Sequence, residues 1–331
     1  MLSDFPPPGA MPIGLIGGTG RSGTTALRDA LALHPDVLAF PELRFSIDPD
    51  GLTDVYRAFR DGWSPYHADV ALRRLRALLE AVAQDSPSAL PGRVARKLGL
   101  DEKAGRQAVP AYHGHRALEV CPTFLERAEQ LLADLEGYRY VGAWTGTPGG
   151  ARAEVRVGGP YERDDLASML GGFWRAVAAD SLEVAGRSYF LDKQTWSILW
   201  AEDIFDLLPT ARLVHVVRDP RDVAASTATM RWGPSDPLLA ARWTADLLGR
   251  WAEIQPRLPA DRVLEVRLED LADGGLRRVV DFLGLEWSAV LEGASLSRTR
   301  EGRWKRDLGN QSGAVAERLA PFVERYGYEP A

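Results

Sequence analysis

The stretch "IGLIGGTGRSGTTALRDALALHPDV" (residues 13–37) decides the fold class. The apolar run at 12–17 predicts a buried strand, and the glycine-rich turn after it is followed by a helix pattern over 22–33. "VLAF" (37–40) predicts a second buried strand. Strand, glycine turn, helix and strand are the opening of a parallel sheet. We therefore expect a P-loop-like three-layer α/β/α fold around a central parallel sheet.

The rest of the chain continues this pattern with two insertions. Residues 52–133 are predicted to be a mostly helical insertion, and the glycine-rich segment 138–163 to be a β-hairpin or an ordered loop. Further strands are expected at 187–193, 211–220 and 261–271, and further helices at 164–184, 197–208, 221 onward, 238–256, 276–285 and 314–328. No repeat or clear linker interrupts them, so we expect one domain over 1–331, with 1–11 as a leader.

Composition narrows the class of protein. With 331 residues, 45% of them hydrophobic, the chain is long enough for a large core, and its net charge of −6 argues against a surface that coats nucleic acid. Cys121 is the only cysteine, which fits a reducing compartment. The N-terminal apolar run is too short for a signal or a membrane span, so we expect a cytoplasmic protein. The Ala- and Arg-rich bias suggests a bacterium with a GC-rich genome.

The glycine-rich turn fits a dinucleotide-binding pattern, G-x-G-x-x-G at 18–23. Glu42 follows the second strand at the spacing of a ribose-binding carboxylate. Tyr189 and Lys193, four residues apart, resemble a dehydrogenase pair, although they lie in a predicted strand and not in a helix. An NAD(P)-dependent oxidoreductase therefore stays open as an alternative.

A Walker-type loop fits less well. Thr24 stands where the lysine that reaches the terminal phosphate should follow Gly23. Asp219 follows a strand, as a Mg²⁺-binding carboxylate would, but Arg218 and Arg221 flank it, and cations weaken a Mg²⁺ site. We therefore expect no metal.

A third interpretation uses every unusual residue of the turn. Backbone N–H groups at a helix N-terminus bind one phosphate, Arg21 adds a cation, and Thr24 and Thr25 add hydroxyl donors. "TGRSGTT" (19–25) resembles the 5′-phosphosulfate loop of sulfotransferases that use 3′-phosphoadenosine 5′-phosphosulfate (PAPS), in particular the tyrosylprotein and bacterial enzymes, which carry Arg in this loop. The resemblance implies that the cofactor is bound by Gly20, Arg21, Ser22, Gly23, Thr24 and Thr25.

Later segments extend the resemblance in the same order along the chain. "RDPRDVAAS" (218–226) is similar to the family's 3′-phosphate motif, which implies that Arg218 and Ser226 grip that phosphate. "LEDL" (268–271) and "DFLGL" (281–285) resemble other late segments of the family. "REGRWK" (300–305) resembles the segment that closes over the nucleotide, and it implies contacts from Arg300, Gly302, Arg303, Trp304 and Lys305.

Some residues in these motifs have structural alternatives. Trp304 could stack on the adenine or fill a gap in the core, and both possibilities stay open. Asp219, Pro220 and Asp222 are predicted to form the turn and the N-cap of the helix that follows.

The resemblance also implies catalytic roles. Glu42 matches the general base of the tyrosylprotein-type segment, with an N-cap or surface glutamate as the alternative. Lys193 matches the lysine that stabilises charge on the transferring or bridging oxygen, although Gln-Thr follows it here where the family has Thr-Pro. Arg21 would assist. Arg44 could hold Glu42 or the substrate, or form an ordinary salt bridge.

The acceptor is a hydroxyl compound whose identity the sequence does not specify. The glutamate base favours a phenolic acceptor or a peptidyl tyrosine, but the same loop type occurs in bacterial enzymes that sulfate sugars, lipids and secondary metabolites. The substrate-binding candidates, which lie in loop segments, are His113, His115, Trp144 and Trp232. A nucleotide-binding homologue without turnover is a further alternative, and the oligomeric state is left open.

Overall fold

The structure is a computed structural model and describes Pro7 and residues 11–83, 116–147, 150–294, 296 and 302–330. Contacts between Cα atoms divide the chain into two compact units. We call Pro41–Gly186 with Asp206–Pro209 the helical unit, and Met11–Phe40, Arg187–Phe205 and Thr210–Ala331 the sheet unit.

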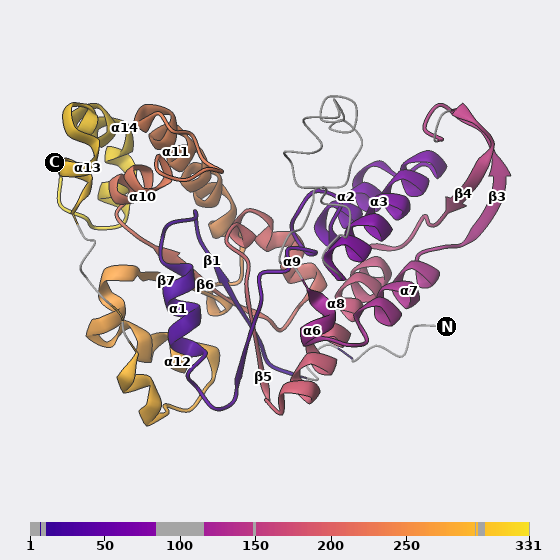
Figure 1. Cartoon of the computed structure of the whole chain (residues 1–331), viewed down its shortest axis with the longest axis horizontal. Helices are drawn as coiled ribbons and strands as arrows, with labels where there is room; N and C mark the ends of the chain where they lie inside the picture. Colours follow the sequence, from indigo (N-terminus) through magenta and orange to yellow (C-terminus); the bar gives the residue numbers. More distant parts are fainter. Residues whose placement is uncertain are drawn as a thin grey trace, which may run out of the picture. The chain divides into compact units, whose positions relative to one another are not determined.

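The sheet unit is built on a five-stranded sheet in the order β2-β5-β1-β6-β7, in which every neighbouring pair is parallel (Figure 1). Its strands are β1 (Ile13–Gly17), β2 (Val37–Phe40), β5 (Tyr189–Lys193), β6 (Arg212–Val217) and β7 (Val263–Arg267). Every residue of β1 and β5 is buried, as expected for parallel strands covered on both faces. The predicted parallel α/β fold is confirmed, because each strand predicted from its apolar run lies in this sheet.

One face of the sheet packs against α1 (Thr24–Leu31) and α12 (Leu276–Leu283) (Figure 1). Leu27 and Leu31 are both fully buried in the core on this face, because a spacing of four places them on one side of the helix. The two helices thereby fix the segment that follows β1.

The opposite side of the sheet carries a second group of helices. These are α10 (Pro220–Thr227), α11 (Pro237–Ile254), α13 (Trp304–Leu308) and α14 (Ser312–Arg325). They pack on one another around a small apolar core, and Trp251 of α11 lies against His215 of β6. The sequence did not predict α13, because five residues are too few to show a helical period.

The helical unit contains the predicted insertion. Its described helices are α2 (Leu52–Gly62), α3 (Pro65–Ala83), α6 (Ala117–Val120), α7 (Phe124–Asp134) and α8 (Arg163–Ala185). A cluster of rings from three segments, Phe45, Phe124 and Phe173, holds the unit together with edge-on contacts of 5.6 to 5.8 Å between ring centroids. The expected helical character of 52–133 is confirmed for the described part, and 84–115 lies outside it.

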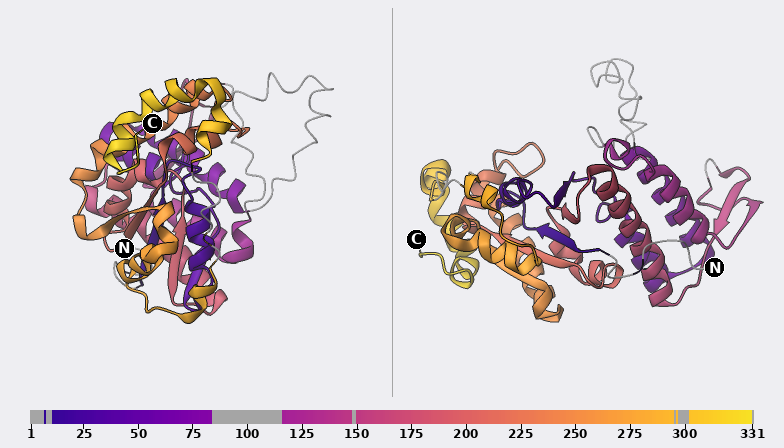
Figure 2. Two further views of the ribbon diagram at one scale, coloured as in Figure 1. Left: turned by 90° about the vertical axis from the view of Figure 1, so that its left-hand side faces the viewer. Right: turned by 90° about the horizontal axis from the view of Figure 1, so that it is seen from below.

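The segment 138–163 contains a β-hairpin, one of the two predicted alternatives. Strands β3 (Tyr138–Gly142) and β4 (Ala153–Val157) pair antiparallel, and β4 contacts α3 (Figure 2). Val155 and Val157 point into the core, whereas β3 is largely exposed.

Short helical turns complete the connections. The predicted helix over 197–208 is a 3-10 turn, η2 (Ser197–Trp200), continued by α9 (Ala201–Leu207). Further turns are η3 (Gln255–Arg257), η4 (Ala260–Arg262), η5 (Leu268–Asp270), η6 (Leu271–Gly275), η7 (Ala289–Gly293) and η8 (Gly309–Gln311).

Candidate active site

The turn between β1 and α1 has the backbone of a phosphate-binding loop. Gly20, Arg21 and Gly23 all have positive φ, at 82°, 56° and 99°. Glycine supplies this conformation without strain at two of the three positions. A Cβ at Gly18 would lie 2.3 Å from Ser22 Oγ, and one at Gly23 would lie 2.5 Å from Leu268, so neither position has room for a side chain.

The loop contains a buried hydroxyl group and helix N–H groups that indicate a ligand. Ser22 is 1% exposed, and its Oγ has no hydrogen-bond partner among the described residues. Buried hydroxyl groups are normally paired. Helix α1 begins at Thr24 with no side-chain cap and no acidic residue in its first turn, so its N-terminal N–H groups suit an anion. Thr25 is exposed at the same end. These residues fit a phosphate group.

Lys193 lies next to this loop. It is the last residue of β5, opposite Ile16 of β1, and it is 5% exposed. Its Nζ donates to Thr195 Oγ1 at 3.3 Å, and the Thr195 carbonyl oxygen accepts from Gly18 N at 2.7 Å. A buried ammonium group is thereby fixed beside the loop. Sequence reasoning missed Thr195, whose contact runs mainly through its backbone and leaves no residue-type signal.

The predicted 3′-phosphate residues meet at the other side of the loop. Arg21 Nε donates to Ser226 Oγ at 2.9 Å, and Arg218 Nη1 donates to the Arg21 carbonyl oxygen at 3.3 Å. Arg218 directly follows β6, and Ser226 lies in the last turn of α10, so the eight-residue spacing brings both to the same place. The loop, the end of β6 and α10 thus contribute two guanidinium groups and a hydroxyl to one cluster.

Asp222 joins this cluster to the C-terminal segment. Its carboxylate accepts from Gly302 N at 2.8 Å and from Trp304 N at 2.9 Å, and Arg218 Nη2 lies 3.6 Å from it. Burial raises the pKa of Asp222, although Arg218 and the two backbone N–H groups act in the opposite direction. The sequence predicts only a turn role for Asp222. Its four-residue spacing from Arg218 indicates the contact between these two side chains, but not the contacts with Gly302 and Trp304.

The C-terminal residues divide into buried and exposed ones. Trp304 is 4% exposed in the core of α10, α11 and α14, with the Arg221 guanidinium 4.5 Å from its ring centroid. The sequence left two alternatives open for Trp304, stacking on adenine or filling a gap in the core, and its side chain lies in the core. Arg303 and Lys305 are exposed, Lys305 Nζ lies 5.3 Å from the Trp304 ring, and Arg300 is outside the described residues.

Asp219 has the predicted capping role. Its carboxylate accepts from Arg221 N at 2.9 Å at the start of α10, and it pairs with Arg221 Nη2 at 2.7 Å. Both side chains are buried, so the carboxylate is neutralised by an arginine. Among the described residues no cluster of three His, Cys, Asp or Glu side chains could hold a metal ion.

Glu42 and Arg44 belong to the helical unit, and Glu42 follows the last residue of β2 by two positions. Arg44 Nη1 lies 3.7 Å from Glu42 Oε1, and Arg44 Nη2 lies 2.6 Å from an Asp48 oxygen. Arg44 has a φ of 64°, in the left-handed region that few L-residues adopt. Arg44 therefore forms ion pairs with two carboxylates. The contact with Glu42 corresponds to the first role considered for it, and the contact with Asp48 is an ordinary salt bridge.

The remaining substrate candidates lie in different units. Trp144, in the helical unit, stacks on Tyr66 at 4.3 Å and donates from Nε1 to Asp69 at 3.2 Å. Trp232, in the sheet unit, is 48% exposed beside Gly20. His113 and His115 lie outside the described residues.

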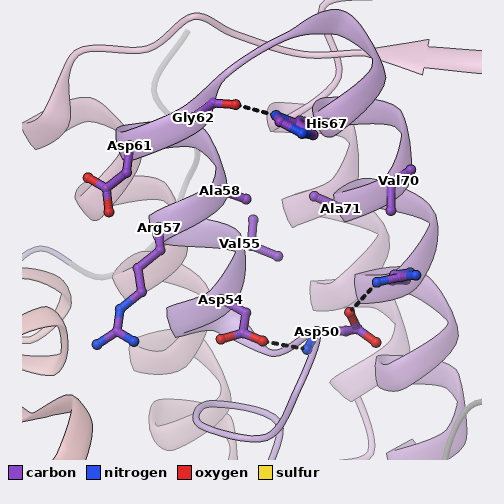
Figure 3. Close-up of a pocket in the computed structure, with 11 residues that line it drawn as sticks. Asp50, Asp54, Val55, Arg57, Ala58, Asp61, Gly62, His67, Val70 and Ala71 are labelled. Atoms are coloured by element: carbon purple, nitrogen blue, oxygen red, sulfur yellow. Dashed lines mark hydrogen bonds and ion pairs between the residues drawn. The ribbon is translucent and has the colours of Figure 1, made fainter.

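A separate cavity of about 520 Å³ lies between α2 and α3 in the helical unit (Figure 3). Val55, Ala58 and Ala71 lie toward its interior, and Asp50 donates its backbone N–H to Asp54 at 3.0 Å at its edge. None of the predicted site residues lines it.

The geometry bears on the dinucleotide alternative. Tyr189 and Lys193 are the two ends of β5, so their Cα atoms are ~13 Å apart, too far for a catalytic pair. Tyr189 is 3% exposed, and burial raises its pKa well above the usual range. A hydride-transfer enzyme built on these two residues is not supported.

These features define a class of protein: an α/β protein with a glycine-rich loop, suited to a phosphate group, at the carboxyl edge of a parallel sheet. The model of the sulfotransferase family matches residues 12–289. The chain belongs to the sulfotransferase family, whose members are PAPS-dependent transferases.

Three sulfotransferases are among the solved structures to which this chain is similar, all at low sequence identity. The sulfotransferase domain of the Synechococcus PCC 7002 olefin synthase is 17% identical with a TM-score of 0.49, covering 99% of this chain and 98% of that chain. The sulfotransferase domain from the curacin biosynthetic pathway is 15% identical with a TM-score of 0.45, covering 97% and 99%. Sulfotransferase STF9 from Mycobacterium avium is 11% identical with a TM-score of 0.44, covering 96% and 78%.

The search of curated proteins gave no match. Within the part of the chain that the structure describes, no helix is both long and apolar enough to cross a membrane.

Proposed function

We propose that the chain transfers the sulfuryl group of PAPS to the hydroxyl group of a phenolic or alcoholic acceptor. The observation that carries this proposal is the meeting of Arg21, Arg218 and Ser226 beside the phosphate-binding loop. NAD has no phosphate beyond its pyrophosphate and no use for this second cluster, and NADP carries its extra phosphate on the 2′ position and not on the 3′ position. PAPS carries both a 5′-phosphosulfate and a 3′-phosphate, so a loop and a separate cationic cluster suit it.

The loop would hold the 5′ end of PAPS. The orphaned Ser22 hydroxyl, the N-terminal N–H groups of α1 and the Thr24 and Thr25 hydroxyls would donate to this anion. Arg218 and Ser226 would hold the 3′-phosphate, and Asp222 keeps Gly302 close to that cluster. When bound, PAPS supplies an activated sulfuryl group and a phosphate leaving group.

Lys193 and Glu42 would carry the chemistry. Glu42 would accept the proton of the acceptor hydroxyl, whose oxygen would take over the sulfuryl group from the bridging phosphate oxygen of PAPS. Adenosine 3′,5′-bisphosphate would be the leaving group and would keep the bonding electron pair. Lys193, whose Nζ donates to Thr195, would neutralise the charge that grows on the bridging oxygen. Arg44 would orient Glu42 through the ion pair between them.

A binding experiment tests the nucleotide assignment. Thermal unfolding is measured with adenosine 3′,5′-bisphosphate, AMP and NAD, for the wild type and for Arg218→Ala. We expect the bisphosphate to raise the melting temperature, because a ligand at a hundred times its Kd adds roughly 2.7 kcal/mol to the free energy of unfolding. Arg218→Ala should weaken bisphosphate binding about tenfold or more, since a charged hydrogen bond contributes about 1.5–3 kcal/mol. It should leave the affinity for AMP unchanged, because AMP has no 3′-phosphate.

The matched control is Arg242→Ala on α11, whose side chain is 69% exposed and makes only a loose contact with Asp246 at 3.8 Å. It should bind the bisphosphate like the wild type. Stabilisation by NAD and not by the bisphosphate, or equal affinity for bisphosphate and AMP in the wild type, would contradict the proposal.

A further inference from the structure

Three tryptophans from separate segments of the sheet unit form a continuous aromatic cluster. The ring centroids of Trp196 and Trp232 are 6.0 Å apart at an interplanar angle of 79°, and those of Trp196 and Trp243 are 6.3 Å apart at 47°. Trp196 precedes η2, Trp232 lies between α10 and α11, and Trp243 lies in α11. We call these three residues the tryptophan wall.

The wall borders the phosphate-binding loop. Trp196 Nε1 donates to the Thr19 carbonyl oxygen at 3.2 Å. The far edge of the Trp232 ring would lie 3.3 Å from a Cβ at Gly20, so this indole packs directly on the loop backbone. Any larger residue at Gly20 would disturb both the positive φ and this contact.

The tryptophan wall is also close in sequence to Lys193, the residue proposed to stabilise charge during sulfuryl transfer. Trp196 directly follows Thr195, whose hydroxyl accepts from Lys193 Nζ at 3.3 Å. A group resting on the wall would therefore lie on the side of the loop where Lys193 is held. The wall contains no member of the Arg218 and Ser226 cluster.

Trp232 presents an apolar surface that the sheet unit does not cover. Its side chain is 48% exposed, and Leu238 and Leu239 at the start of α11 are 38% and 55% exposed. Trp196 packs against Trp232 in an edge-to-face arrangement, so this contact covers one part of the Trp232 ring. Exposed apolar surface next to a functional loop is typical of a ligand-binding surface.

We propose that Trp232 forms one side of the acceptor subsite and stacks on the aromatic ring of a phenolic acceptor. This inference rests on the proposed sulfuryl transfer. An indole face attracts the edge or the offset face of a second ring, and a saturated ring of equal size lacks that interaction. A phenolic hydroxyl also gives up its proton near pH 10, far more readily than an aliphatic alcohol, which suits a carboxylate base.

The test compares two ligands with the same carbon skeleton, the planar aromatic 2-naphthol and its puckered saturated counterpart decahydro-2-naphthol. Each is titrated by calorimetry into protein saturated with adenosine 3′,5′-bisphosphate. The proteins are the wild type, Trp232→Leu, Trp232→Phe and, as a control, Tyr138→Leu, which removes an exposed ring in the helical unit. Bisphosphate affinity is measured for each protein first.

We expect the wild type to bind naphthol roughly three- to tenfold more tightly than the saturated alcohol. Trp232→Leu should bring that ratio close to one, while Trp232→Phe and Tyr138→Leu keep it. A wild-type ratio near one, or a ratio that survives Trp232→Leu, overturns the inference. Loss of bisphosphate affinity in Trp232→Leu also overturns it, since Trp232 would then hold the nucleotide. Absence of bisphosphate binding in the wild type is the separate failure of the proposed function.

Discussion

Arg21 connects the two parts of the proposed nucleotide site through a single residue. Its positive φ of 56° shapes the loop, its Nε donates to Ser226, and its carbonyl oxygen accepts from Arg218. The sequence predicted a cation for the 5′ end of PAPS at this position. The structure adds contacts of Arg21 with Ser226 and Arg218, so the two proposed phosphate-binding regions share a residue.

A second residue-scale contact joins the buried His215 to the half-buried Glu265, which lies opposite it on β7. Glu265 accepts from His215 Nδ1 at 3.0 Å, from Trp251 Nε1 at 2.9 Å and from Gln255 Nε2 at 2.7 Å. Burial raises the pKa of Glu265, but the hydrogen bonds and the charge of His215 outweigh it and lower the pKa to about 2.

This lowered pKa gives a prediction for stability against pH. Because the folded-state pKa lies below the ordinary value of 4.5, ionised Glu265 stabilises the fold above pH 4.5 and loses this effect as the pH falls toward 2. The full effect is about 3 kcal/mol, of which about 2 kcal/mol is lost between pH 6 and pH 3. Urea unfolding at the two pH values should therefore show Glu265→Gln costing about 2 kcal/mol less at pH 3 than at pH 6.

The control for this measurement is Glu253→Gln, which alters a carboxylate that is 64% exposed on α11. It should follow the wild type at both pH values. An equal cost of Glu265→Gln at pH 6 and pH 3 would show that the carboxylate contributes no pH-dependent stability.

At the scale of elements, α10 organises most of the site. Asp219 caps its first turn, Pro220 occupies its first position, Asp222 holds the segment of Gly302 and Trp304, and Ser226 meets Arg21 near its end. One eight-residue helix therefore orders both the proposed 3′-phosphate cluster and the segment of Gly302 and Trp304.

Asp222→Ala tests this role of α10. It leaves the N–H groups of Gly302 and Trp304 without their acceptor, which should cost about 1–3 kcal/mol of unfolding free energy. Hydrogen exchange of residues 302–308 should accelerate more than that of α1. Asp307→Asn, with a side chain 41% exposed on α13, is the control and should leave exchange unchanged. Unchanged exchange in Asp222→Ala would show that the segment is held by other contacts.

Sequence patterns predicted some elements well and others poorly. The buried strands were predictable because their apolar runs are bounded by turn residues, as in β6 before Arg218 and Pro220. The hairpin at 138–163 stayed one of two alternatives, because the exposed β3 has no clear alternation of apolar and polar residues. The helix α13 is stabilised by packing of Trp304 and Leu308, which a five-residue segment does not reveal.

At the scale of the whole molecule, the order of strands is what the sequence could not supply. The strands β5 and β6 flank β1 although they follow it by more than 170 residues, and only tertiary packing selects that order. The parallel direction was predictable, and it places the ends of β1, β5 and β6 at one edge. Hence a position for Lys193 at the same edge as the loop could be expected, while its place next to the loop and the contact through Thr195 could not.

The measurement that tests the central claim most directly is sulfuryl transfer itself. Wild-type protein is incubated with PAPS and phenolic or alcoholic acceptors, and formation of the sulfate ester and of adenosine 3′,5′-bisphosphate is followed. We expect stoichiometric formation of both products, and a loss in kcat of about 10²–10⁴ in Glu42→Gln with unchanged bisphosphate affinity. Glu119→Gln, with a side chain 63% exposed in the helical unit, should keep wild-type activity. Wild-type activity in Glu42→Gln would exclude that residue as the base, and a wild type that binds the bisphosphate yet forms no sulfate ester with any acceptor would contradict the account.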